Sequence, residues 1–158
     1  MKNALKKPML LLIALVMTLS SINLIACNKN KSATEFYELV HETQEYLDTV
    51  ADDIYDNWYN AIYNDYFGGD INWAIASALS DNEENISTIK ANDEKIKELY
   101  KEAKDTEFED EVKAVMTAYS EYYELVINIS GSFNTYKDSK ETLKKALSSA
   151  LKELEMEL

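Results

Sequence analysis

The side chains that most often carry out catalysis are scarce in this sequence. It contains one histidine, His41, and one cysteine, Cys27. His41 lies beside an apolar helical stripe rather than on it, so we expect it on a solvated helix face and not in a Ser-His-Asp triad. Zinc sites need several histidine or cysteine ligands, and the three glycines form no nucleotide-binding motif. We therefore expect no nucleophilic, zinc-dependent or nucleotide-dependent chemistry.

Acidic side chains are abundant. The chain has 29 Asp and Glu against 16 basic residues, and its formal net charge is −13. Asp52, Asp53 and Asp56, with Asp65 and Asp70, could in principle hold calcium, but the order of oxygen ligands around a central glycine that an EF-hand requires is missing. Paired carboxylates can hydrolyse glycosides, yet a smooth helical bundle offers no obvious substrate cleft. We expect no metal, no cofactor and no enzymatic activity, and the negative charge disfavours nucleic acid as a partner.

One segment carries more aromatic side chains than a helical core needs. The stretch NWYNAIYNDYFGGDINW, residues 57 to 73, surrounds a single helix–helix turn, and we call it the aromatic turn. We expect its two tryptophans to fill the end of the core, whereas its three tyrosines follow a second stripe at spacings of four and three. Such clusters are typical of protein interfaces, but we favour packing of this stripe under another helix and keep an exposed interface as the alternative to be tested. The candidate partner-binding residues are Trp58, Tyr59, Tyr63, Tyr66, Phe67 and Trp73.

The N-terminal residues have the pattern of an export signal. Lysines 2, 6 and 7 precede an unbroken apolar run from Met9 to Met17, and small residues follow. Nine apolar residues are too few to cross a bilayer, which takes about 20. The next residues, Leu24-Ile25-Ala26-Cys27, resemble the lipobox of bacterial lipoproteins. This resemblance covers residues 1 to 27 only and implies that a diacylglyceryl group is attached to Cys27 and that cleavage occurs before it.

The resemblance sets the expected domains and location. Residues 1–26 are the signal peptide, residues 27–32 the lipidated cysteine with a short linker, and residues 33–158 a single domain. The lipid on Cys27 would anchor the protein to the cell membrane, facing the extracytoplasmic side. A lipidated Cys27 also cannot form a catalytic pair with His41. Removal of the signal, which holds three lysines and no acid, leaves a chain still more negative than the whole.

The rest of the chain has apolar residues at helical spacings of three and four. The paired glycines before Asp70 should end one helix and Asp70 should cap the next, and TEFE at 106–109 resembles a capping box. The predicted core stripes are Phe36, Val40, Thr43, Leu47, Val50, Ile54, Trp58 and Ala61; Ile75, Leu79, Asn82, Ile86, Ile89, Asp93, Ile96, Tyr100 and Ala103; Phe108, Val112, Val115, Tyr119, Tyr122, Val126 and Ile129; and Phe133, Tyr136, Leu143, Leu147, Ala150 and Leu154.

Two places leave the helix pattern open. Gly131 and Ser132 read as a stop followed by a cap, yet the apolar spacing continues through them, so we expect a break and keep one long helix as the alternative. Asn82 and Asp93 occupy stripe positions: either they form a buried polar pair, or the helix breaks near residues 80–85 or turns them to water, which we favour. The predicted fold is all-α, an antiparallel four-helix bundle, or three long helices if Gly131 does not break the third.

Two classes of function fit these observations. The first is a membrane-anchored, non-catalytic binding module with an unidentified protein or small-molecule partner. If its first helix begins near Thr34, its length would carry the aromatic turn about 50 Å along the helix, away from the membrane. The second is a ligand-sequestering lipoprotein, or an accessory subunit of a transporter or envelope enzyme, for which a pocket inside the bundle would be evidence.

Overall fold

The chain is all-helical over its described part. The structure, a computed structural model, describes the backbone of residues 6–158 and the side chains of residues 31–158. No strand occurs among these residues. The elements are α1 (Lys6–Tyr63), the short 3-10 helix η1 (Tyr66–Gly69), α2 (Ile71–Asp81), α3 (Glu83–Ala103), α4 (Glu109–Ile127) and α5 (Phe133–Glu157).

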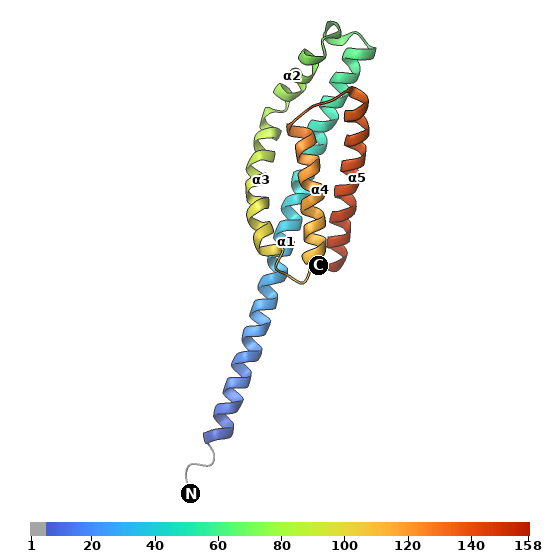
Figure 1. Cartoon of the computed structure of the whole chain (residues 1–158). Coiled ribbons are helices and arrows are strands. Elements are labelled where there is room, and N and C mark those ends of the chain that lie inside the picture. Colours follow the sequence, from blue (N-terminus) through green and yellow to red (C-terminus); the bar gives the residue numbers. More distant parts are fainter. Residues whose placement is uncertain (1–5) are drawn as a thin grey trace.

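The helices lie side by side around α1 (Figure 1). α1 contacts each of the other four helices, α4 packs along α5, and α3 also contacts α4. The chain turns at η1 and returns along α2 and α3, then crosses to α4 and finally to α5 (Figure 1). The aromatic turn therefore lies at one end of the packed helices, where α1 passes into α2.

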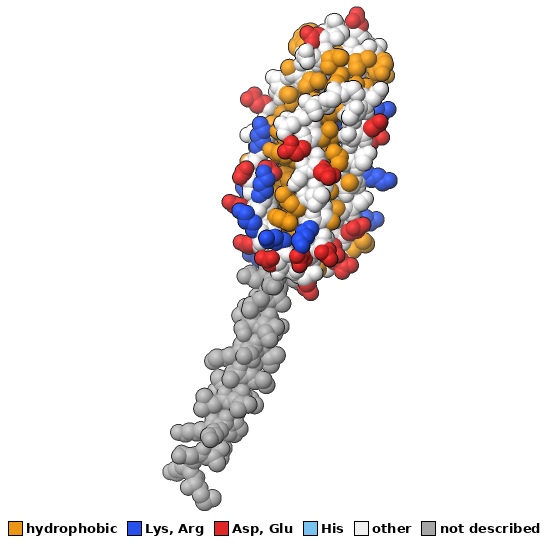
Figure 2. Space-filling model, in the orientation of Figure 1, with side chains coloured by type: hydrophobic (Ala, Val, Ile, Leu, Met, Phe, Trp, Pro, Cys, Tyr) orange, Lys and Arg blue, Asp and Glu red, His pale blue; other side chains and the backbone are white. Residues whose placement is uncertain are grey.

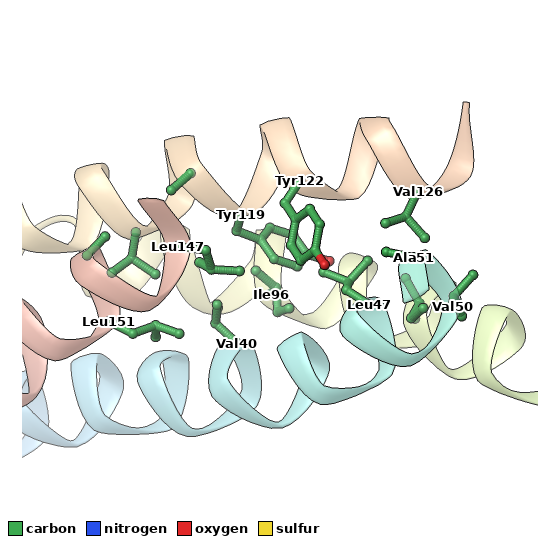
Figure 3. Close-up of a cluster of buried hydrophobic side chains, with 14 of the residues drawn as sticks. Val40, Leu47, Val50, Ala51, Ile96, Tyr119, Tyr122, Val126, Leu147 and Leu151 are labelled. Atoms are coloured by element: carbon green, nitrogen blue, oxygen red, sulfur yellow. The ribbon is translucent and has the colours of Figure 1, made fainter. Parts of the chain in front are cut away.

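The core lies where the predicted stripes face each other. Every residue of the α1 stripe is buried, and so are most residues of the other three. Figure 3 shows side chains of α1, α3, α4 and α5 pointing into one shared interior, among them Leu47, Ile96, Tyr119 and Leu147. Apolar residues three and four apart lie on one helix face, so this pattern alone identifies the buried faces.

Polar side chains buried between the helices link α1 to its neighbours. The Asn92 amide donates to Thr43 Oγ1 at 3.1 Å, and the Gln44 amide donates to Ser148 Oγ at 2.7 Å. These bonds join α1 to α3 and to α5. A shift of one helix along another would break these bonds and leave buried polar groups without a partner, which is costly. The bonds therefore help to fix the position of each helix along its axis.

The break predicted at Gly131 is confirmed. α4 ends at Ile127, α5 begins at Phe133, and Gly131 has a φ of +90°. Glycine lacks the Cβ that disfavours this backbone conformation. Ser132 then caps α5 by accepting a hydrogen bond from the Thr135 N–H at 3.3 Å. Together the two residues reverse the chain and allow α5 to pack on α4.

The expectation for Asn82 and Asp93 is half right. The helix does break at Asn82, where α2 ends and α3 begins, but both side chains are buried rather than turned to water. They do not form a pair with each other. The Asn82 amide donates to Asp53 Oδ2 at 2.7 Å, whereas Asp93 accepts from Lys97 Nζ at 2.6 Å. Hydrogen bonds to Asp53 of α1 for Asn82, and from Tyr119 of α4 for Asp93, also compensate their burial, and a single stripe cannot reveal these contacts between helices.

The capping box predicted at 106–109 is wrong. α4 begins at Glu109, so Thr106 lies three residues before the helix. Its hydroxyl donates to the Ala103 carbonyl at 2.6 Å and accepts from the Phe108 N–H at 3.3 Å, which ties the connection between α3 and α4 together. Glu109 pairs with Lys113 on the following turn and does not reach back. Thr106 thus stabilises the connection instead of capping the helix.

The start of α1 differs from the prediction. The helix begins at Lys6, not near Thr34, so the backbone is already helical over residues 27–32, which we treated as a linker. Between Pro8 and Gly68 the sequence holds no proline or glycine that would end a helix. The predictions for the side chains of residues 1–26 and for Cys27 lie outside the described residues. Within the part whose side chains are described, no helix is sufficiently long and apolar to cross a membrane.

Candidate interaction surface at the aromatic turn

The aromatic turn is built from residues with unusual backbone angles. α1 ends at Tyr63, and Asp65, Phe67, Gly68 and Gly69 all have positive φ values between 53° and 75°. Two of these four residues are not glycines, and such residues cost about 1 kcal/mol or more in this region. Asp70 then begins α2 by accepting a hydrogen bond from the Trp73 N–H at 3.1 Å, as predicted. The turn is a tight reversal with a defined shape.

The stripe of three tyrosines is exposed. Tyr59, Tyr63 and Tyr66 are 39%, 59% and 64% exposed, so they do not pack under another helix. The two tryptophans behave differently from each other: Trp58 is buried, as expected, whereas Trp73 is 60% exposed and does not fill the end of the core. The α2 residues that pack inward are Ala74 and Ala78, which places Trp73 on the outer side of the helix.

Phe133 organises the rings of α1. It is the first residue of α5, and its ring lies 5.2 Å from Tyr55, 5.9 Å from Trp58, 6.2 Å from Tyr59 and 6.1 Å from Tyr63. Tyr59 and Tyr63 also lie 4.7 Å apart. Ring centroids at 4.5 to 7 Å are in the favourable range for aromatic pairs. Tyr59 and Tyr63 are therefore held in place by a segment far away in the sequence.

A second ring pair lies on the turn itself. Phe67 and Trp73 meet edge to face, with centroids 5.2 Å apart and ring planes at 87°. The left-handed backbone at Phe67 and the Asp70 cap on the Trp73 N–H fix both ends of this pair. The turn therefore presents two small aromatic groups, one from α1 and α5 and one from η1 and α2.

Beside these rings lies an open groove, which we call the turn groove. Its first part has a volume of about 520 Å³, and a neighbouring part of about 460 Å³ shares three of its lining residues. α2 forms one wall, the end of α4 and the connection to α5 form the other, and Trp58 and Ile62 of α1 lie between them. The apolar lining residues are Trp58, Ile62, Ile71, Ile75, Ala76, Leu79, Ile127, Ile129 and Phe133.

Trp58 is under-satisfied at the floor of this groove. Its side chain is 95% buried, and its indole N–H has no acceptor within the part of the chain whose side chains are described. Leaving a buried donor unpaired costs about 1–3 kcal/mol. Packing against Phe133 and Tyr136 fixes the ring but supplies no acceptor. This end of the core is thus less well satisfied than the middle, where buried amides and tyrosines are paired.

The aromatic turn and α2 carry acids and no lysine. The sequence has no lysine between Lys31 and Lys90, which includes the whole turn and α2. The residues that line the turn groove are all uncharged, in a chain of which 28% is charged. Figure 2 shows hydrophobic side chains gathered at this end, with acidic ones at its extremity. A partner here would meet an apolar, aromatic surface within a negative field.

Between the packed helices, away from the turn, the hydroxyl groups of three buried tyrosines have polar contacts, and their pKa values are shifted. The Tyr122 hydroxyl donates to Asp48 at 2.8 Å and that of Tyr119 to Asp93 at 3.4 Å. Burial raises the pKa of Tyr119, Tyr122 and Tyr136 far above the usual value, and the neighbouring carboxylates raise it further. All three stay neutral donors at ordinary pH, a structural role and not an acid–base one.

The remaining candidates from the sequence do not come together as a site. His41 is exposed and stacks on Tyr37 with ring centroids 5.8 Å apart. Of the acids that we considered for calcium, Asp52 forms an ion pair with Lys140 at 2.5 Å, and Asp53 accepts a hydrogen bond from Asn82. Over residues 31–158, no group of three or more His, Cys, Asp or Glu side chains is placed to hold a metal ion.

Sequence reasoning missed part of this surface. Phe133 appeared only as a core residue of the last helix, and Ile62 and Ile71 fall outside the core stripes. The signal that could have revealed the isoleucines was available: they are apolar residues off the stripe, on either side of a turn already rich in aromatics. Phe133 had no such signal, because its place depends on how α5 packs against α1.

No protein-family model, no curated protein and no solved structure matches this chain.

Proposed function

We propose that this chain is a membrane-anchored, extracytoplasmic lipoprotein that works as a non-catalytic binding module, and that it captures its partner through the aromatic turn. The packed helices form an antiparallel four-helix bundle in which α2 and α3 together make the second member. In this arrangement the bundle is a rigid support, and the lipid on Cys27 holds it at the cell membrane.

One observation carries the binding role. Among residues 31–158, eight large hydrophobic side chains are exposed, and six of them belong to the segment from Tyr59 to Trp73. Exposed apolar patches that are concentrated in one place mark interaction sites more often than chance exposure does. Tyrosine and tryptophan are also the side chains most enriched among interface hot spots. The ring contacts with Phe133 keep Tyr59 and Tyr63 in place, so these two side chains lose little conformational freedom on binding.

The ligand-sequestering alternative would use the turn groove. Its volume of about 520 Å³ is within the range of small-molecule sites. Against it, the groove is open at the surface, and the middle of the bundle is filled by buried side chains such as Tyr119, Tyr122 and Leu147. A binding surface for a macromolecule therefore accounts better for the arrangement than an enclosed ligand pocket.

The test is capture of a partner from the native envelope by wild type, Tyr63→Ala and Trp73→Ala. Both side chains are about 60% exposed, so the variants should unfold at the same temperature as wild type. We expect either change to weaken capture at least about tenfold if the ring anchors the partner, because hot-spot truncations cost about 2 kcal/mol or more.

Tyr46→Ala is the matched control. It removes a half-buried tyrosine from the same helix α1, about 25 Å from Tyr63 at 1.5 Å per residue. Capture should survive this change. Equal capture by wild type, Tyr63→Ala and Trp73→Ala would reject the aromatic turn as the binding surface.

A further inference from the structure

One face of α2 has no helix packed against it. α2 packs on α1, η1 and α3, but no Cα of α2 lies within 8 Å of a Cα of α4 or α5. Figure 1 shows the reason: α4 ends at Ile127, short of the level of the aromatic turn. The place beside α2 that a further helix would fill in the upper part of the bundle is therefore open, and it is the turn groove.

The open face has the dimensions and spacing of a helix-packing surface. Ile71, Ile75 and Leu79 recur at every fourth residue and all line the groove. Side chains four apart form the ridges that pack between the ridges of a second helix. From Ile71 to Leu79 the ridge is about 12 Å long, which corresponds to two to three turns. Ile127 and Ile129 supply the opposite apolar wall.

The charges around the groove restrict its occupant. Asp65 and Asp70 lie in the connection between Ile62 and Ile71, and neither forms an ion pair with a lysine of residues 31–158. No lysine lies on η1 or α2. A basic partner would gain from this field, whereas a second copy of this chain would bring the same acids together.

We propose that the turn groove binds an amphipathic helix of a partner protein, with an apolar stripe of two to three turns flanked by basic residues. The inference rests on the proposed binding function and specifies the partner's chemistry. The partner helix lies along α2 and takes the place that α4 leaves open. Its apolar side chains enter between Ile71, Ile75 and Leu79 on one wall and Ile127 and Ile129 on the other, and its basic residues face the acids of the turn.

The test uses the full chain and three synthetic peptides labelled with a fluorophore. One is an amphipathic Leu/Lys helix of about 14 residues, one is its Leu/Glu counterpart with the same apolar stripe, and one has the Leu/Lys composition in scrambled order. Dissociation constants come from fluorescence anisotropy. In a Trp73→Phe background, Trp58 is the only tryptophan and reports whether binding reaches the floor of the groove.

Two variants of equal charge separate the groove from general attraction. Ile71→Glu places a carboxylate in the groove at a position that is 38% exposed and at the start of the helix, where an acid is tolerated. Ser80→Glu adds the same charge at an exposed position of the same helix outside the groove lining. We expect Ile71→Glu to weaken binding of the amphipathic Leu/Lys peptide at least about tenfold and Ser80→Glu to change it less than about twofold.

Each other outcome decides against the proposal. Equal binding of the amphipathic and scrambled Leu/Lys peptides, or equal losses in the two variants, would show attraction by net charge alone. Tighter binding of the Leu/Glu peptide would refute the basic partner. Binding of a dodecyl-chain lipid with a Trp58 response, but of no peptide, would assign the groove to an acyl chain. Peptide binding reports on the groove alone, whereas capture from the native envelope reports on the whole aromatic turn. Capture that is lost in Tyr63→Ala while wild type binds no peptide would refute this inference and leave the proposed function standing.

Discussion

Alkaline pH should unfold this protein through three buried tyrosines. Tyr119, Tyr122 and Tyr136 are completely buried, and burial followed by nearby carboxylates raises the pKa of each well above the ordinary value of 10.0. In the unfolded chain they lose their protons near pH 10, whereas in the folded chain they keep them. Above that pH the unfolded state binds fewer protons, so the stabilisation, complete below pH 10, is lost as the pH rises.

The size of the effect follows from the number of protons. Each proton contributes a slope of about 1.36 kcal/mol per pH unit, so three give a loss of about 4 kcal/mol per unit above pH 10. A domain with an ordinary free energy of unfolding of about 5–15 kcal/mol would then unfold within about one to four pH units. Urea denaturation followed by helical circular dichroism, at several pH values from about 9 to 11.5, measures this slope.

Two tyrosine variants test the assignment. Tyr122→Phe removes one buried proton, so its slope should be about 1.4 kcal/mol per unit smaller than that of wild type. Loss of the bond to Asp48 should also cost about 1.5–3 kcal/mol at neutral pH. Tyr63→Phe is the control for the substitution itself, because it removes the hydroxyl of a tyrosine that is 59% exposed. The reasoning is refuted if all three chains share one slope, or if every tyrosine ionises near pH 10 while the helices remain intact.

Three further changes give separate predictions. Cys27→Ser should release the protein from the membrane fraction or leave its signal uncleaved; fully processed, membrane-bound mutant protein in fractionation and mass measurements would contradict lipidation. Gly131→Ala should lower the free energy of unfolding by about 1–2 kcal/mol because φ is +90° there, and not for lack of space, since a Cβ would meet only Thr135 at 3.7 Å; unchanged urea stability would argue against strain. Trp58→Phe should lower the free energy of unfolding by less than about 1.5 kcal/mol, because it removes an unpaired N–H as well as apolar area. Trp58→Ala should lower it by about 3–5 kcal/mol. Equal losses of stability in the two variants, measured by thermal or urea unfolding, would mean that the unpaired N–H has no energetic cost.

The core could be predicted because it depends on local spacing. Helix geometry alone puts Phe36, Val40, Leu47 and Ile54 on one face, and the apolar character of that face requires it to be buried. The break at Gly131 was predictable for a similar reason, since the glycine and the capping serine act on the backbone next to them. These properties need no knowledge of which helix lies opposite.

Other features depend on polar contacts that the apolar spacing does not encode. Asn82 and Asp93 are buried because Asp53, Lys97 and Tyr119 compensate them, and these residues come from other turns or other helices. Whether Asn82 faced water or the interior could not be decided from its own stripe. Thr106 similarly resembled a cap by its spacing to Glu109, but its hydroxyl binds a carbonyl of the preceding helix.

The aromatic turn shows how the end of one helix can determine what another exposes. If α4 continued beside α2, it would cover Ile71, Ile75 and Leu79, which line the turn groove. Gly131 and the preceding connection end α4 early and begin α5 at Phe133, whose ring then holds Tyr59 and Tyr63 from the side without covering them. Rings already fixed in this way lose little freedom when a partner binds. The residues that reverse the chain between α4 and α5 thus also leave the binding surface open, and a variant that lengthened α4 past Ile127 should close the turn groove while keeping the core below it.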